Sequence, residues 1–563
     1  RFESGEFADI CQSSRTLSPA RREPRSALEH QLHAIWSAVL GVEMGLDESF
    51  FELGGNSLLA TQILSRLREQ FQVDLPFPTL FEENSTIAGM ARSIESRRGE
   101  RKPPFQIPKA RPDEPLPLSF AQERLWFLDQ LHPHSGLYHV RVALHLQGSP
   151  NVQALSKSLQ YLAQRHEIFR TRFKVRAGRP VQVILPTDTI SLETVTGNGA
   201  AGSDLHECLQ QITLPSRHPL DLEHGPLWKA QWFSLQEQHH LLVLIFHQMA
   251  IDGWSLGLVL DELAQVYSAI EGQREPELKP LPIQGADFAV WQRQQPTSAE
   301  ALAFWQHELR APWPKGRLRS NNTSAVPCAG PAITLIYRVE RDLVESIRGL
   351  CQQESLTPFM IFLGAFAATL EPFLTENELI IGTPIAGRHH VETERMVGFL
   401  VNTLALRLAI DSNKTVHAWL RQIRQTVLNA FQHAEAPFEK VIETVNPKRD
   451  GSNPLIRFWI GSIDLPDALS AGGLKMLAEP LPNSHAQFDL SLFIHSHPTE
   501  WKVVFEGNSD VIDRAGLERF QRLFCALLRR LTLDPEKTIS TLLRESAEAA
   551  DAGPSNAPSA FTS

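Results

Sequence analysis

The sequence lacks the features that would assign it to several specialised classes of protein. Five cysteines among 563 residues are an odd number without metal-ligand spacing: Cys11, Cys208, Cys328, Cys351 and Cys525. Reduced thiols in a cytoplasmic protein without a bound metal are therefore expected. No apolar run approaches the roughly 20 residues that cross a membrane, and a net charge of −10 gives no overall basic field for nucleic acid. We therefore expect the protein to bind neither a membrane nor nucleic acid.

The remaining composition is that of an ordinary globular protein, with 42% hydrophobic and 21% charged residues. The chain is too long for one core, so two to four domains are expected. It begins with Arg1 rather than Met and has no charged-then-apolar signal segment, so we expect a fragment of something longer or a trimmed chain.

The first part of the chain predicts a linker and a small helical unit. Residues 1–24 are polar and contain Pro19 and Pro24, as linkers do. Within residues 25–98 apolar side chains recur at helical spacing, and Gly41 ends the first pattern. The three apolar faces are Leu28, Leu32, Ile35, Trp36, Val39 and Leu40; Leu59, Ile63, Leu67 and Phe71; and Ile87, Met90, Ala91 and Ile94.

Ser57 allows two interpretations. Serine is a favoured N-cap, and Gly54-Gly55-Asn56-Ser57 before an apolar helix is a reasonable helix start without any chemistry. Alternatively, the glycines leave an exposed hydroxyl at a helix N-terminus, a place that favours an incoming phosphate. Local physics alone favours the cap.

The longer stretch around Ser57 shifts this choice. Residues 47–60 read Asp-Glu-Ser-Phe-Phe-Glu-Leu-Gly-Gly-Asn-Ser-Leu-Leu-Ala. They closely resemble the peptidyl carrier domains of nonribosomal peptide synthetases, with Asn56 where many members have His or Asp. The resemblance implies a small all-α four-helix bundle in which a phosphopantetheinyl transferase attaches 4′-phosphopantetheine to Ser57. The thiol of that arm would carry an aminoacyl or peptidyl group.

Beyond a proline-rich linker at residues 99–115, the pattern becomes that of a larger α/β region. Its length favours two lobes, expected at residues 116–290 and 291–545, before a flexible tail at residues 546–563. The continuous apolar run at residues 241–246 predicts a buried strand. A helix is expected after Gly253, with Ser255 available as its N-cap.

A polar loop at residues 247–252 joins that strand to that helix. His247 and Asp252 therefore lie at the carboxyl end of a strand, where reactive groups are held rigidly. A histidine beside a core strand is more often structural than catalytic, so this loop alone does not establish a reaction.

Seven collinear stretches, the loop among them, resemble the condensation domains of nonribosomal peptide synthetases. They are residues 119–128, 165–171, 247–255, 287–291, 397–403, 433–439 and 449–455. The resemblance implies two chloramphenicol-acetyltransferase-like lobes in a V, with the active site in a tunnel at their junction and carrier domains docking at opposite mouths. In that family an acceptor amine attacks the donor thioester, so the protein chiefly aligns reactants, moves a proton and stabilises an oxyanion.

The loop departs from the family motif His-His-x-x-x-Asp-Gly at one position. Gln248 stands where the second histidine, the residue usually assigned to proton handling or amine positioning, is expected. A glutamine amide donates and accepts hydrogen bonds but takes up no proton near neutral pH. If that histidine is mainly a base, the replacement costs ~10²–10⁴ in rate; if it orients the amine, Gln248 preserves much of the effect.

The resemblance also implies roles for the neighbouring residues. His247 matches the first, more structural histidine, and Asp252 a structural ion-pair partner, for which we expect Arg388 as the arginine. Gly253 permits close approach of a substrate to the backbone. Trp254 and Ser255 complete a Gly-Trp-Ser continuation that epimerisation domains usually lack.

Three functions stay open at this point. The first is an amide-forming enzyme that works as a monomer with upstream and downstream modules or an acceptor carrier, since the chain carries no adenylation signature. The second is a catalytically silenced platform that gates or binds carrier-tethered intermediates or recruits a tailoring enzyme. The third is an acyltransferase that forms esters.

Overall fold

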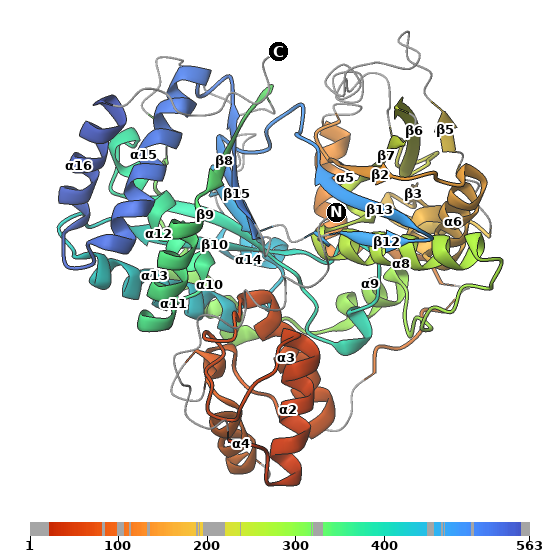
Figure 1. Ribbon diagram of the computed structural model, residues 1–563, viewed down its shortest axis with the longest axis horizontal. Coiled ribbons are helices and arrows are strands. Elements are labelled where there is room, and N and C mark those ends of the chain that lie inside the picture. The colour runs from red at the N-terminus through yellow and green to blue at the C-terminus, as the bar shows by residue number, and fades with distance from the viewer. Residues whose placement is uncertain are drawn as a thin grey trace, which may run out of the picture. The chain divides into compact units, whose positions relative to one another are not determined.

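The computed structural model describes residues 22–81, 85–97, 106–111, 114–131, 136–186, 190, 192–194, 220–236, 238–316, 318, 330–446, 455–462, 465–466, 468–496 and 500–552. The chain divides into two compact units, residues 1–104 and 105–563. Both are drawn in Figure 1, where the colour follows the residue number. Residues 1–21 of the predicted linker at 1–24 and residues 449–454 of the motif stretch at 449–455 lie outside the described residues.

The first unit is helical. Its described helices are α2 (Ala27–Leu40), α3 (Ser57–Phe71), the 3-10 helix η1 (Phe77–Leu80) and α4 (Ile87–Ser96). Ser26 and Glu29 form a capping box at the start of α2, and Gly41 ends it with a left-handed φ of 68°. Trp36, Phe50 and Phe81 are buried in the core. Among the described residues, the predicted four-helix bundle thus consists of three α-helices and one 3-10 helix.

The second unit contains two lobes, each built on a six-stranded sheet. The elements of its first half are β1 (Leu116–Pro117), α5 (Phe120–Leu131), β2 (His139–Gln147), α6 (Val152–Arg165), β3 (Thr171–Arg176), β4 (Arg179–Ile184), β5 (Leu192–Thr194), β6 (Trp228–Gln236), β7 (His239–His247), η5 (Gln248–Ala250), α8 (Gly253–Glu271) and α9 (Gly285–Gln294). The predicted strand at residues 241–246 is therefore the central part of β7.

The second half of this unit builds most of the other lobe. Its elements are α10 (Ala299–Glu308), β8 (Ala332–Val339), α11 (Arg341–Glu354), α12 (Pro358–Leu370), β9 (Glu378–Ile385), β10 (Asn402–Ala409), α13 (Val416–Gln432), α14 (Phe438–Val445), β11 (Phe458–Ser462), β12 (Leu469–Ala471), β13 (Leu474–Pro480), β14 (Leu490–Ser496), β15 (Trp501–Asn508), α15 (Arg514–Leu533) and α16 (Ile539–Ala552). The predicted α/β class with two lobes is confirmed.

The lobes do not separate at residue 290 as the contiguous boundaries predict. The strand orders are β12-β13-β2-β7-β6-β5 in one sheet and β10-β9-β11-β14-β15-β8 in the other. Strands β12 and β13 come from the range assigned to the second lobe, yet β13 pairs antiparallel with β2 in the first. Strand pairing is set by contacts between residues far apart in the chain, which a boundary drawn along the sequence does not contain.

Each sheet carries its helices on one face (Figure 1). In the first lobe, Val142 and Leu144 of β2 join the core that contains residues of α6 and α8, such as Leu159 and Leu260. In the second lobe, Phe505 of β15 packs against aromatic side chains of α15. Alternate residues of these strands point to the opposite, helix-free faces.

The helix-free faces of the two sheets lie toward each other. Glu479 of β13 accepts a hydrogen bond from His145 at 3.2 Å, and this bond lowers the pKa of its carboxyl. The charges of Lys502 on β15 and Arg338 on β8 lower that pKa further. A carboxylate in the first sheet therefore lies within electrostatic reach of two cations in the second.

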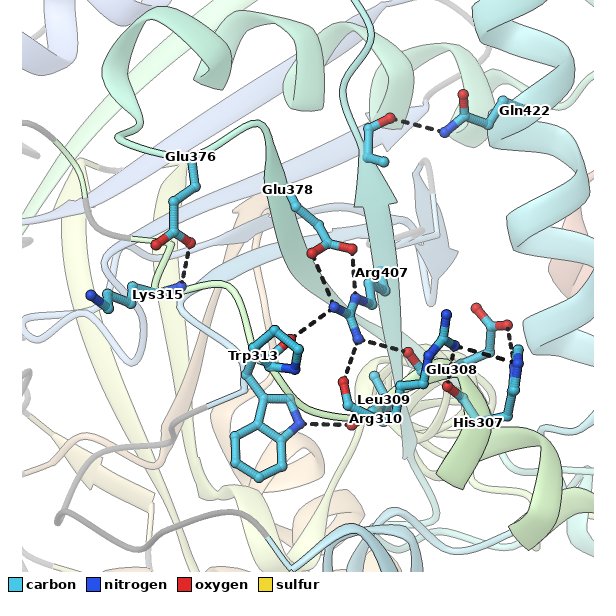
Figure 2. Close-up of polar contacts among 12 residues, drawn as sticks. His307, Glu308, Leu309, Arg310, Trp313, Lys315, Glu376, Glu378, Arg407 and Gln422 are labelled. Atoms are coloured by element: carbon cyan, nitrogen blue, oxygen red, sulfur yellow. Dashed lines mark hydrogen bonds and ion pairs between the residues drawn. The ribbon is translucent and has the colours of Figure 1, made fainter.

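Arg407 of β10 fixes the segment that follows α10 to the edge of the second sheet (Figure 2). Its guanidinium donates two hydrogen bonds to the Glu378 carboxylate, at 2.7 and 3.0 Å. It also donates to the backbone carbonyl of Glu308, the last residue of α10, at 3.2 Å, and to those of Arg310 and Pro312 in that segment at 2.6 and 2.9 Å. One planar fork thereby binds a strand and a connecting segment together.

The predicted flexible tail from residue 546 is wrong in its first part, because α16 continues to Ala552. Ile539 and Leu542 of this helix are buried, and Ser546 is buried too. Glu545 accepts a hydrogen bond from Arg530 of α15 at 2.9 Å. The alanines read as linker composition are strong helix formers, and packing against α15 lets them extend the helix.

Within the described residues, no single helix has both the length and the apolar composition to span a membrane. Helices α11 and α12 meet these criteria only as a pair, across a bend of 104°.

Candidate functional site

The loop before α3 places Ser57 as the first residue of that helix. Asn56, not Ser57, is the N-cap: its side-chain oxygen accepts hydrogen bonds from the backbone N–H groups of Leu58 and Leu59, both at 3.0 Å. The N-cap interpretation of Ser57 is therefore wrong, because the amide one residue earlier already satisfies the first donors of the helix. Capping gives no reason for a serine at position 57.

The two glycines before the cap have separate structural reasons. Gly54 adopts a left-handed φ of 81°. A Cβ at Gly55 would overlap with the buried ring of Phe50. The glycines thus let the chain fold back over the aromatic core immediately before Ser57.

His247 ends β7, and both of its ring nitrogens have partners. The Met249 backbone N–H donates to Nδ1 at 3.2 Å, which leaves the proton on Nε2, and Nε2 donates to the Asp129 carboxylate at 3.4 Å. The ring is 1% exposed. An imidazole held on both sides within the fold shapes the loop and leaves no nitrogen for a reactant.

Gln248 follows in η5 and is partly exposed. Its backbone N–H donates to the Tyr138 carbonyl at 2.7 Å. Its side-chain oxygen accepts from Gln487 Nε2 at 3.3 Å, and the same nitrogen donates to the Leu137 carbonyl at 3.1 Å. The Leu137 carbonyl can only accept a hydrogen bond, so the amide nitrogen of Gln487 must be the atom that faces it. Because the same nitrogen also contacts Gln248, Gln248 must present its side-chain oxygen to Gln487. Within the described residues, the Gln248 amide nitrogen then remains a donor without an acceptor.

Asp252 and Arg388 form the predicted ion pair, which joins the loop to the segment after β9. Arg388 donates to both carboxylate oxygens of Asp252, at 2.8 and 3.1 Å. The Ser255 and Leu400 backbone N–H groups donate to the same carboxylate at 2.8 and 3.0 Å. Both charged side chains are essentially inaccessible, at 0% and 1%. The carboxylate is therefore saturated with donors in the interior.

The residues after Asp252 extend this junction. Asp252 is the N-cap of α8, so the expectation of Ser255 as N-cap is wrong. The Ser255 hydroxyl instead donates to the Gly398 carbonyl at 2.9 Å and accepts from Arg388 at 2.7 Å. Trp254 donates from Nε1 to the Glu394 carbonyl at 2.8 Å, and the Arg388 guanidinium lies 5.3 Å from its ring centre. Residues 254 and 255 thus contact the segment at 394–398.

Gly253 is exposed at the start of α8, and a Cβ there would meet no atom within 4 Å. The space beside this glycine is open, as close approach of another molecule requires. The roles of His247, Gln248, Asp252 and Gly253 in a reaction, and the tunnel itself, stay predictions.

Two side chains at this loop were not singled out from the sequence. Asp129 binds His247 and lies at the end of α5, just after the opening motif stretch. Gln487 lies on the segment that crosses from β13 to β14 and contacts Gln248. The proximity of Asp129 to the first motif was a usable signal, whereas nothing local to Gln487 indicates its contact.

No group of three or more described His, Cys, Asp or Glu side chains is arranged to hold a metal ion. Cys351 and Cys525 are free thiols, and burial raises the pKa of Cys351 to about 12. A thiol with so high a pKa is a poor nucleophile.

Two family models match the chain in the predicted order. The phosphopantetheine attachment site matches residues 30–94, and the condensation domain matches residues 113–551. Ser57 lies inside the first match and the 247–255 loop inside the second.

Curated relatives are similar along nearly all of this chain. One component of the linear gramicidin synthase of Brevibacillus parabrevis is 36% identical over 537 residues, which cover 92% of this chain and 10% of the relative. Malpinin synthetase of Mortierella alpina is 33% identical over 534 residues, which cover 92% and 7%. The chain therefore spans about a tenth or less of these relatives.

A solved structure shares the fold of the second unit. The X-domain from teicoplanin biosynthesis matches with a TM-score of 0.67 and 23% identity, over 77% of this chain and 99% of that structure. At this identity the likeness concerns the fold alone.

Proposed function

Because the chain belongs to the condensation domain family and carries a phosphopantetheine attachment domain ahead of it, we propose that it forms amide bonds in nonribosomal peptide synthesis. The donor is an aminoacyl or peptidyl thioester on the arm of Ser57 or of an equivalent carrier. The acceptor is an amine delivered by a neighbouring module or by a separate carrier protein.

The observation that carries this proposal is the amide nitrogen of Gln248, which has no acceptor among the described residues and belongs to a rigid loop. Arg388, Asp252 and Ser255 fix the loop through buried hydrogen bonds, and Gln487 occupies the oxygen of Gln248. The nitrogen can donate to the oxygen of a thioester carbonyl and stabilise the charge that develops there. Gln248 acts in this proposal as an oxyanion donor and not as a base.

The reaction balances without a protein base. The amine nitrogen attacks the thioester carbon, the carbon–sulfur bond breaks, and the thiolate leaves. The proton lost by the amine ends on that thiolate by way of water, which gives an amide and a free thiol. The thioester is already activated, so alignment and charge stabilisation supply the rate.

Isosteric variants of Gln248 test this role. Gln248→Glu keeps the shape but replaces the donor by an anion, so we expect at least ~10²-fold slower amide formation from a loaded donor and a soluble amine. Gln248→His is expected to retain activity and to add a titration near pH 6.5 to the rate profile. Gln265→Glu on α8 is the matched control, because Gln265 is exposed and lies away from the loop.

The alternative outcomes are distinct. Product only after Gln248→His favours the silenced platform, and product only with a hydroxyl acceptor favours ester formation. Equal rates for native chain and Gln248→Glu contradict the oxyanion role.

We also propose the partners that this function requires. They are a phosphopantetheinyl transferase that modifies Ser57, upstream and downstream synthetase modules, and a cytoplasmic setting in which the chain works as a monomeric unit. Mass spectrometry of native chain and Ser57→Ala after incubation with a transferase and coenzyme A tests the first of these. Attachment to both would contradict the assignment of Ser57.

A further inference from the structure

Arg141 of β2 lies on the helix-free face of the first sheet, next to the 247–252 loop. In the antiparallel pair β2–β7, His139 is opposite His247 and Arg141 is opposite Ile245. Arg141 is therefore two residues along the strand from the His139–His247 pair, on the same face of the sheet and about 7 Å away. The neighbouring same-face residue Ala143 packs with Ile245 and Leu481.

Arg141 is buried without a counter-charge. It is 4% exposed, and its Nη1 atom has no hydrogen-bond partner. Among the residues that the structure describes, no carboxylate forms an ion pair with it. Guanidinium stays protonated in proteins, so burial leaves a full positive charge in a poorly solvated place. A cation held in this way lacks the anion that would complete its site.

The segment at residues 481–487, which crosses between the lobes, contacts both Arg141 and Gln248. Its first residue, Leu481, donates its backbone N–H to the Arg141 carbonyl at 3.0 Å, and Gln487 contacts Gln248. Between them lies His485, whose pKa is lowered by burial and then by the charge of Arg141. The same segment therefore contacts the backbone of β2 at Arg141 and the 247–252 loop.

We propose that Arg141 binds a carboxylate on the side chain of a residue being condensed, and that this domain selects an acidic aminoacyl or peptidyl substrate. The inference rests on the proposed function. The phosphate of the carrier arm is excluded as the anion, because it lies at the opposite end of the pantetheine chain from the reacting thioester, whereas Arg141 lies two residues along the strand from the start of the loop. A planar guanidinium matches a carboxylate in two parallel hydrogen bonds.

Binding of stable analogues tests this without turnover. Aspartyl- and asparaginyl-pantetheine, with an amide in place of the thioester, differ only in a carboxylate against a carboxamide. We expect the native chain to bind the aspartyl analogue at least about tenfold more tightly by calorimetry. Arg141→Met is expected to abolish this ratio and Arg141→Lys to keep part of it, because lysine retains the charge without the fork.

Lys229→Met is the matched control. Lys229 lies on β6, opposite the same Ile245 from the other side, and is partly exposed. It is a cation on the same face, about 10 Å from Arg141. If any positive charge on this face favoured the aspartyl analogue, Lys229→Met would also lower the ratio of the two affinities. A ratio that survives Lys229→Met supports a specific contact at Arg141. Equal binding of the two analogues, or a preference that survives Arg141→Met, overturns the inference.

Turnover experiments locate the carboxylate and keep the two proposals separate. Asp/Asn and Glu/Gln pairs are offered first on the donor thioester and then on the acceptor, with a neutral partner each time. If the acidic member is preferred only on the donor or only on the acceptor, the carboxylate that Arg141 binds belongs to that substrate. If the acidic substrates and their amides condense at equal rates, the proposed function stands and Arg141 is rejected as a selector. If no pair condenses, the calorimetric ratio still decides the role of Arg141.

Discussion

Arg388 and Arg141 are two buried arginines of the same unit with opposite surroundings. Arg388 has a counter-charge: it binds both oxygens of Asp252, the Ser255 hydroxyl and the Met396 carbonyl, and its Nε is left without a hydrogen bond. Arg141 is equally hidden from water but has no anionic partner among the described residues. One charge therefore fixes the loop to the rest of the domain, whereas the other remains available to a ligand. Removing the partner or the charge should therefore have opposite effects at the two sites.

Removing the carboxylate partner of Arg388 should lower stability the most. Asp252→Ala leaves a guanidinium buried without its carboxylate, which should cost about 3–5 kcal/mol in the free energy of unfolding. Urea denaturation followed by tryptophan fluorescence measures it. Asp261→Ala, an exposed carboxylate on the same helix, is the control. A loss at Asp252 no larger than at Asp261 would contradict the central role of this pair.

Glu506 is a buried acidic group and so the counterpart of these two buried cations. It lies on β15, it is 5% exposed, and burial raises its pKa to about 7 from a usual 4.5. As the pH rises, the Glu506 carboxyl loses its proton in the unfolded chain before it does so in the folded state. Its contribution to the free energy of unfolding is therefore complete below about pH 4.5 and is lost between about pH 4.5 and pH 7.

Glu506→Gln should remove this fall. Relative to the native chain, its stability should rise by about 3 kcal/mol between pH 4.5 and pH 7. Denaturation at several pH values gives the difference, and parallel curves for the two proteins would refute the assignment.

Arg407 is an intermediate case, partly exposed but rich in partners (Figure 2). Arg407→Lys keeps the charge and loses the planar fork that reaches Glu378 and the Arg310 carbonyl at once. We expect a loss of about 1–2 kcal/mol. Arg341→Lys, at an exposed pair on α11, should change stability by less than about 0.5 kcal/mol. Equal effects at the two positions would mean that the fork contributes nothing beyond charge.

Arg141→Met should have the smallest effect and the opposite sign. Replacing an unpaired buried cation by an apolar side chain of similar length removes a desolvation penalty, so we expect a gain of about 1 kcal/mol. Thermal and urea denaturation measure it in the absence of ligand. A clear loss of stability would show that Arg141 has a structural partner and would end the contrast with Arg388.

Local signals predicted much of this molecule. The helix faces of the first unit, the buried strand β7 and the helix α8 follow from the spacing of apolar residues. The resemblance implied an ion pair for Asp252, and the expected partner, Arg388, 136 residues further along the chain, binds it. The family assignment and the attachment domain around Ser57 are confirmed by the two family models.

What the sequence did not predict depends on competition or on distant contacts. Asp252 took the capping position expected for Ser255, and Asn56 the one that local physics alone would give to Ser57, because neighbouring residues of similar propensity compete for one cap. The pairing of β13 with β2 and the contact of Gln487 with Gln248 join residues hundreds of positions apart. No local pattern specifies such partners, and none indicates that Arg141 lacks one.

The β13–β2 pairing has a consequence for how the protein is made. The first sheet stays incomplete until residue 480 has left the ribosome, although His247 is synthesised much earlier. At typical translation speeds this interval is roughly tens of seconds. During that time β2 exposes an unpaired edge, so the nascent chain depends on chaperones or on slow collapse to avoid association with neighbouring chains. Truncations that end before Leu474 should for the same reason yield insoluble protein.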